Sequence, residues 1–206
     1  MLCIRWTSRQ RLVRSGLREI MSELLDRSTV VVKRYGGTLS QFTGDGIMAV
    51  FGAPIALEDH AFRACLAALG IQEEAKRLAA GVQDRDGIDL GLRVGLNSGQ
   101  VIAGEIGSGT LGYTAIGEQV GMAQRMESVA PPGGVMLSAS TARLVDSSAA
   151  LGEAELVQIK GAEEAVRVHR LLGIGEQHRV GRAESNLVGR RWEMSDSRSV
   201  SSPCLN

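Results

Sequence analysis

Apolar residues recur at helical spacing near the start of the chain, and short apolar runs separated by turn residues follow. From Leu17 to Val32 the apolar positions are three and four residues apart, and the pattern stops at Tyr35-Gly36-Gly37, where glycine can end a helix. Two apolar runs on either side of Gly44-Asp45-Gly46 predict a β-hairpin. A second helix should begin at Glu58, because acidic residues suit the first turn of a helix.

Strand and helix patterns alternate along the rest of the chain without a repeat. The expected elements are strands at 88–96 and 100–106 that turn at Asn97-Ser98-Gly99, a strand-like segment at 113–116, a helix at 118–129, a strand at 135–137, a helix near 139–145, and a hairpin of 156–159 with 166–172. Hairpins outnumber crossover connections in this order. The pattern therefore favours an α+β fold with a mostly antiparallel sheet and helices packed on it.

The two ends of the chain differ in composition from this patterned middle. Five arginines and no acidic residue occur between Met1 and Arg18, and the segment after Leu172 is rich in Gly, Ser and Arg. The basic segment could be an arm for an acidic partner or a solvated end. We therefore divide the chain into a divergent basic segment (1–16), a compact domain (17–172) and a flexible tail (173–206).

Composition and charge narrow the classes of protein further. The 206 residues are 44% hydrophobic and 22% charged, which is typical of a globular domain and excludes a collagen or a disulfide scaffold. Lys+Arg and Asp+Glu number 23 each, so overall charge favours neither a nucleic acid nor a membrane partner. The three cysteines lack metal-ligand spacing, and no stretch approaches the roughly 20 apolar residues of a membrane helix. We expect a cytoplasmic protein.

Three places could carry chemistry on their own pattern. Asp45, at the tip of the expected hairpin, could bind a divalent metal that bridges phosphates, although Asp-Gly is also a common hairpin turn. Residues 107–112 match GxGxxG, but a dinucleotide site needs its third glycine inside a helix, and strand-like residues follow here. Arg125 shares a helix face with Gly121, and it could bind phosphate or be a solvated, salt-bridged arginine.

Four blocks of the chain carry a more specific signal, namely Phe42–Gly52, Val94–Gly104, Tyr113–Gly117 and Ala123–Glu127. The residues of these blocks and their order resemble the catalytic domain of class III adenylate and guanylate cyclases. In detail they resemble the mycobacterial cyclase domains of large cyclase–ATPase regulators. The resemblance implies a ferredoxin-like βαββαβ core and a homodimer or heterodimer with its sites at the interface. It also implies conversion of ATP or GTP to the 3′,5′-cyclic nucleotide and pyrophosphate with Mg²⁺ or Mn²⁺.

The same resemblance implies roles for five residues. Asp45 matches the second of two metal-binding aspartates, and Arg125 matches the arginine that stabilises the transition state. Gln41 falls where adenylate cyclases usually have a base-reading lysine, and Thr114 falls at the partner base-reading position. Lys160 lies near the lysine that contacts the phosphates. Because an amide both donates and accepts hydrogen bonds, Gln41 could read either adenine or guanine.

The chain departs from the family pattern where catalysis depends on it. The first metal-binding aspartate belongs to a Phe-x-Asp block on the first strand, which should fall at or before Met1, and nothing acidic precedes Glu19. That strand is therefore missing, unless Leu2 to Trp6 replaces it. Gly121 stands where the family has a transition-state asparagine. A homodimer should be nearly inactive, since one missing transition-state donor typically costs about 10²–10³ in rate.

Two functional classes remain open. The chain is either a weakened cyclase that works as the complementary half of a heterodimer, or a non-catalytic module that dimerises with related domains. Asn186–Met194 resembles the opening of an ATPase module, and no GxxxxGK[ST] motif follows it. We therefore expect either a remnant of a longer regulator or a small cyclase with divergent tails.

Overall fold

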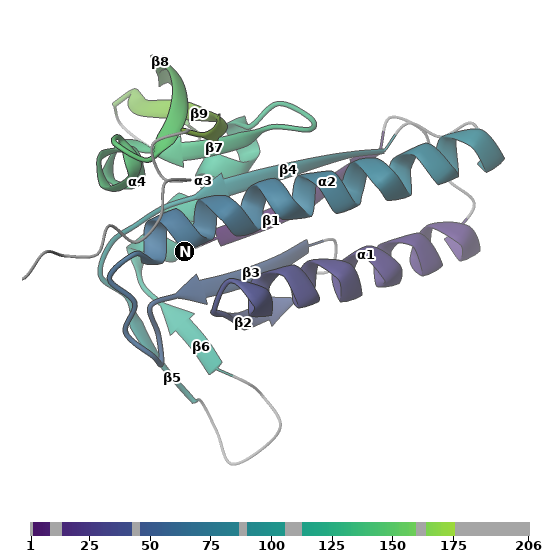
Figure 1. The fold of residues 1–206 in the computed structure, drawn as a ribbon, viewed down its shortest axis with the longest axis horizontal. Coiled ribbons are helices and arrows are strands. Elements are labelled where there is room, and N and C mark those ends of the chain that lie inside the picture. Colours follow the sequence, from purple (N-terminus) through teal and green to yellow (C-terminus); the bar gives the residue numbers. More distant parts are fainter. Residues whose placement is uncertain are drawn as a thin grey trace, which may run out of the picture.

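Nine strands and four helices occur in the residues that the structure, a computed structural model, describes: 2–8, 14–42, 46–86, 90–105, 113–159 and 164–175 (Figure 1). In chain order they are β1 (Leu2–Ser8), α1 (Arg14–Arg34), β2 (Gly37–Phe42), β3 (Gly46–Phe51), α2 (His60–Asp86), β4 (Leu90–Leu96), β5 (Ile102–Glu105), β6 (Tyr113–Ile116), α3 (Glu118–Val129), β7 (Val135–Ser138), α4 (Ala139–Val145), β8 (Ala149–Val157) and β9 (Val166–Ile174). None of the helices in these ranges has the length and apolarity needed to cross a membrane.

Seven of the strands form one sheet in the order β2-β3-β1-β4-β7-β9-β8. All neighbours are antiparallel except β4 and β7, which run parallel. The first six elements follow the chain order β1-α1-β2-β3-α2-β4, and their strands lie in the spatial order β2-β3-β1-β4. This is the ferredoxin-like βαββαβ arrangement, so the predicted α+β fold is confirmed.

The N-terminal residues provide the central strand of this sheet. Leu2 pairs with Ala49 of β3 on one side and with Leu96 of β4 on the other. Of the two alternatives for the first strand, replacement by the N-terminal residues is the one observed. The sheet therefore includes residues that lie before the expected start of the compact domain at Leu17, and α1 also begins earlier, at Arg14.

Helices cover both faces of the sheet. Alternate residues of a strand point to opposite faces, and Ile47 packs in the main core with α1 and α2, whereas Met48 packs with Ala123 of α3. Figure 1 shows α1 and α2 side by side along the sheet. The α2 face in this core is rich in small residues such as Ala64 and Ala68, which lets the helix lie close to the strands.

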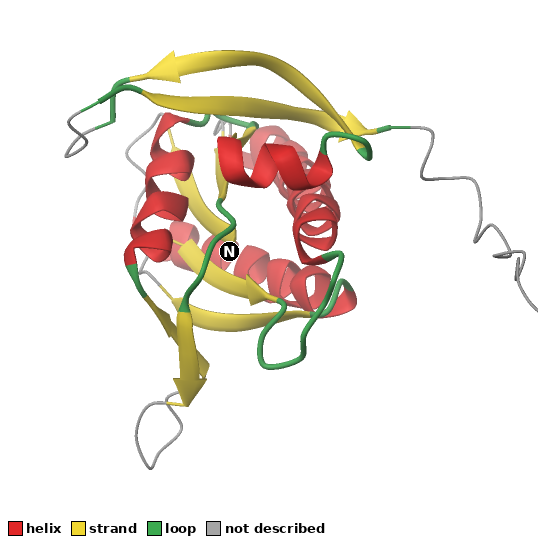
Figure 2. Cartoon of the chain, turned by 90° about the vertical axis from the view of Figure 1, so that its left-hand side faces the viewer, coloured by secondary structure: helices red, strands yellow, loops and turns green. Residues whose placement is uncertain are grey.

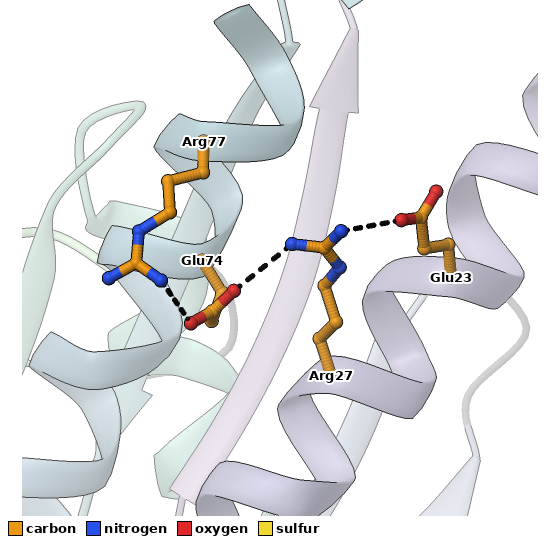
Figure 3. A network of polar contacts seen from close by, with 4 residues as sticks. All are labelled: Glu23, Arg27, Glu74 and Arg77. Carbon is orange, nitrogen blue, oxygen red and sulfur yellow. Dashed lines mark hydrogen bonds and ion pairs between the residues drawn. The ribbon is translucent and has the colours of Figure 1, made fainter. Parts of the chain in front are cut away.

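A chain of ion pairs joins the outer sides of α1 and α2 (Figure 3). Arg27 of α1 donates hydrogen bonds to Glu23 at 2.6 Å and to Glu74 of α2 at 3.2 Å, and Arg77 binds the other oxygen of Glu74 at 2.8 Å. Hydrogen bonds to Glu23 and then Glu74 raise the pKa of the Arg27 guanidinium. Because the groups are largely exposed, the network contributes more to helix orientation than to stability.

Two connections differ from the sequence prediction. Strands β4 and β5 do not form a hairpin about Asn97-Ser98-Gly99, because Asn97 and Ser98 are buried and β5 pairs with β6 in a separate two-stranded sheet. Strand β8 begins at Ala149, seven residues before the predicted Leu156. It lies at the sheet edge with most residues exposed, so it lacks the apolar alternation that marks a half-buried strand.

The pair of strands β5 and β6, called the β5–β6 arm here, projects from the body of the molecule (Figures 1 and 2). Ile102 pairs with Ile116 in its antiparallel register, and these side chains are 80% and 53% exposed. No helix follows the GxGxxG residues, because β6 comes next in the chain. The sequence-based rejection of a dinucleotide fingerprint is therefore confirmed.

Candidate functional site

The structure describes three of the five predicted site residues. Gln41 lies exposed near the end of β2, and Arg125 is half-buried on α3. Thr114 is described as a backbone position in β6, paired with Gly104. Asp45 and Lys160 lie outside the described residues.

The two base-reading candidates lie on elements that meet at one hydrogen bond. The side-chain oxygen of Ser40, the residue before Gln41, accepts the backbone N–H of Ala115 at 3.1 Å. Ala115 directly follows Thr114, so this contact places β6 beside β2, the edge strand of the main sheet. No local sequence pattern points to Ser40, because its partner lies 75 residues away along the chain.

Helix α3 is held closely against β4, and this contact positions Arg125. A Cβ atom at Gly95 of β4 would collide with the backbone of Ala123 and Glu127, so only glycine allows this approach. The buried stripe of α3 is Ala123, Met126 and Glu127, and Arg125 lies beside it. The Arg125 side chain has no hydrogen bond or ion pair with the described residues. The salt-bridged alternative for this arginine therefore finds no partner in the described part of the chain.

A buried polar cluster around Asn97 fixes the first turn of α3. Asn97 is 2% exposed, and its Nδ2 donates to the backbone oxygen and the Oε1 of Gln119 at 3.0 and 2.9 Å. Its Oδ1 accepts from the hydroxyls of Ser138 and Ser140 at 2.7 and 3.2 Å. The cluster joins the ends of β4 and β7 to the starts of α3 and α4. Sequence reasoning missed it by assigning Asn97 to a turn.

A cavity of about 530 Å³ borders this cluster. Its wall includes Asn97, Ser98 and Gln119 together with the end of β3 and the segment that leads into α2. Neither Gln41 nor Arg125 lines it. Of the predicted site residues whose side chains are described, none therefore borders this cavity.

The described residues do not assemble a two-metal site. Strand β1 reaches the hairpin that contains Asp45, because Arg5 pairs with Gly46, but none of its residues carries a carboxylate. Within the described ranges, no group of three His, Cys, Asp or Glu side chains is placed to hold a metal ion.

Comparison with known proteins identifies adenylate and guanylate cyclases as relatives of this chain. Residues 15–173 match the family model of the adenylate and guanylate cyclase catalytic domain. Adenylate cyclase 1 of Rhizobium meliloti is 28% identical over 158 residues, which are 75% of this chain and 24% of that protein. Guanylate cyclase soluble subunit beta-2 of Rattus norvegicus is 29% identical over 161 residues, 78% of this chain and 22% of that protein. The chain thus spans about a quarter of the length of these relatives.

Solved structures agree with the fold. The guanylate cyclase domain of RhGC from Catenaria anguillulae, in complex with GTP, superposes with a TM-score of 0.72 at 26% identity and covers 84% of this chain and 96% of that domain. The adenylyl cyclase CyaB from P. aeruginosa has the same fold, with a TM-score of 0.76 at 23% identity and coverage of 87% and 96%. With a family model that matches most of its length, the chain belongs to the adenylate and guanylate cyclase catalytic domain family.

Proposed function

We propose that this chain is a nucleotidyl cyclase domain that works as the complementary half of a heterodimer. In the reaction the ribose 3′-oxygen of ATP or GTP loses its proton and attacks the α-phosphorus. The bond from that phosphorus to the pyrophosphate oxygen breaks, which releases the cyclic nucleotide and pyrophosphate. The observation that carries this proposal is an asymmetry: Arg125 is half-buried and unpaired among the described residues, whereas β1 offers no carboxylate.

Within this proposal the chain supplies nucleotide recognition and charge stabilisation. The Arg125 guanidinium neutralises negative charge that develops on the phosphate oxygens, an interaction that strengthens in the transition state. Gln41 and Thr114 contact the base, and Lys160 contacts the phosphates. Class III cyclases generally use divalent metals; we propose Mg²⁺ or Mn²⁺, which when bound would stabilise negative charge on the phosphates. Both metal-binding aspartates come from the partner.

The family often works as dimers, and the β5–β6 arm supports a dimer here. Ile102 and Ile116 form a cross-strand apolar pair that is largely exposed on a projecting hairpin. Burial of apolar surface is the main driving force of protein association. We propose that a second cyclase domain, one that carries both aspartates, covers this pair.

A second candidate is a non-catalytic module that dimerises with related domains. It is favoured by Gly121, which has no side chain to replace the transition-state asparagine, and by the lack of any acid in β1. A likeness to mycobacterial regulators and a cytoplasmic location are compatible with both candidates and stay predictions.

A complementation assay distinguishes the two candidates. The chain is mixed with a cyclase domain that has both aspartates but alanine at the position matching Arg125, and cyclic nucleotide is measured from ATP and from GTP with Mn²⁺. We expect product only in the mixture. Arg125→Ala should reduce it by about 10²–10³-fold, whereas Arg143→Ala, a change at an exposed arginine of α4, should not. If the mixture never exceeds the rate of the partner alone, the non-catalytic module is the correct reading.

A further inference from the structure

Ser40 links the edge of the main sheet to the β5–β6 arm. Its side chain makes a hydrogen bond from β2 to the backbone of β6. Its hydroxyl oxygen lies 3.1 Å from the backbone nitrogen of Ala115, and Ala115 is 6% exposed. The bond is therefore partly buried. In such surroundings a backbone N–H that loses its acceptor is costly, so this contact holds its geometry.

A β-bulge aims Ser40 at the arm. Leu39 of β2 pairs with Ala49 of β3, yet Gln41 pairs with the adjacent Met48, so Ser40 is an extra residue in β2. A bulge breaks the regular alternation of a strand and redirects a side chain. On an edge strand of a two-stranded ribbon, N–H groups that face outward lack a strand partner. The N–H of Ala115 is such a group, and the Ser40 hydroxyl oxygen accepts its hydrogen bond.

The two residues flanking this bond are the base-reading candidates. Gln41 directly follows Ser40, and Thr114 directly precedes Ala115. We propose that Ser40 is a positioning residue that sets the spacing of Gln41 and Thr114 and thereby the choice between adenine and guanine. This inference rests on the proposed function.

The loss of the Ser40 hydroxyl should affect selectivity more than folding. Ala115 also packs with Met48 and Val50 of β3 and with Ala123 of α3, so apolar contacts keep β6 on the sheet without the bond. What is lost is the fixed offset between the two strands. A site that recognises a base by two hydrogen-bonding side chains distinguishes adenine from guanine only when both side chains reach the base. A shift of β6 relative to β2 would therefore weaken the discrimination between the two bases.

The test uses the mixed dimer described above with three variants. Ser40→Ala removes the acceptor, Ser40→Thr keeps a hydroxyl, and Thr38→Ala removes a hydroxyl from the same strand as a matched control. We measure kcat/KM and KM for ATP and GTP, and the binding of fluorescent ATP and GTP analogues. In Ser40→Ala, the ratio of kcat/KM for ATP to kcat/KM for GTP should move about 3–10-fold closer to one, mainly through changes in KM. Ser40→Thr should restore the wild-type ratio, and Thr38→Ala should not change it.

The outcomes separate this inference from the proposed function. A wild-type mixture that neither binds nor converts nucleotide overturns the proposed function, and the inference falls with it. An active wild-type mixture with an unchanged base ratio in Ser40→Ala overturns the role of Ser40 alone. Hydrogen exchange gives an independent readout, because the peptide containing residues 113–116 should exchange faster in Ser40→Ala. If that variant does not fold, Ser40→Cys, with a weakly accepting thiol, provides the same comparison.

Discussion

Apart from the neighbouring backbone of α3 itself, an added Cβ atom at Gly121 would meet no described atom within 4 Å, whereas one at Gly95 would collide with the backbone of α3. The two glycines therefore have different meanings. Gly95 is required by the close packing of α3 on β4. Gly121 is not required by the packing of the described residues, because a Cβ atom fits there without displacing a described neighbour. In the proposed function, the lack of a side-chain donor at position 121 is thus a chemical deficit that this packing does not impose.

Gly121→Asn should raise turnover in the mixed dimer. Restoring a transition-state donor is worth up to about 10²–10³ in rate when the donor is well placed. The control is Gly121→Ala, since both changes improve helix propensity over glycine and only one adds a donor. Initial rates with saturating ATP or GTP provide the measurement. Equal rates for the Asn and Ala variants would mean that position 121 does not face the reacting phosphates.

The site residues that sequence could predict are those carried by contiguous motifs. Arg125 and Gly121 lie in one helical block, and Gln41 lies next to the Gly-Asp-Gly hairpin, so local order identifies them. Asn97 could not be predicted as a buried centre, because Ser138 and Ser140 contact it across 41 and 43 residues of sequence. The contact made by Ser40 depends on a bulge in β2 and on a strand of another sheet. Both depend on tertiary contacts that no local pattern encodes.

At the scale of elements, β1 shows why the central strand position can be filled without the family's motif. Strand pairing uses backbone groups, which β4 supplies along the whole of β1 and β3 supplies along residues 2–5. The residues of β1 include Ile4, Trp6 and Thr7, which favour strands. The sequence analysis emphasised the five arginines between Met1 and Arg18 instead. The fold therefore needs a strand at this position, whereas the chemistry of the metal-binding half needs an aspartate on it.

The exposed isoleucines of the β5–β6 arm should contribute to association with a second cyclase domain. Ile102→Asp and Ile116→Asp should weaken association with a cyclase partner by at least tenfold, because each places a charge in a buried apolar contact. Stability of the isolated chain should change little, since both side chains are largely exposed. Sedimentation velocity at several concentrations measures the association. Leu156→Asp, at a 70% exposed position on β8, is the control, and equal weakening by all three changes would argue against the arm.

At the scale of the whole molecule, the parts that hold the fold together are largely separate from those that the reaction needs. The main core is built by α1, α2 and the sheet, while the proposed site residues Gln41, Thr114 and Arg125 lie at the sheet edge, on the arm and on α3. The equal numbers of acidic and basic residues give no net charge to oppose association with a similar domain. The fold of the described residues is therefore compatible with the proposed absence of the metal-binding half of the site.

Cys65 reports on the integrity of that core. It lies in α2 with no exposed surface, and burial raises the pKa of its thiol to about 12. Because alkylation needs an accessible thiolate, iodoacetamide should label Cys65 only as the domain unfolds, with the same urea midpoint as far-UV circular dichroism. Labelling is quantified on the Cys65 peptide by mass spectrometry. The folded pKa exceeds the unfolded value of 9.0, so unfolding releases a proton at alkaline pH, and the midpoint should fall as pH rises above 9. Labelling well below the midpoint would mean that α2 opens separately from the sheet.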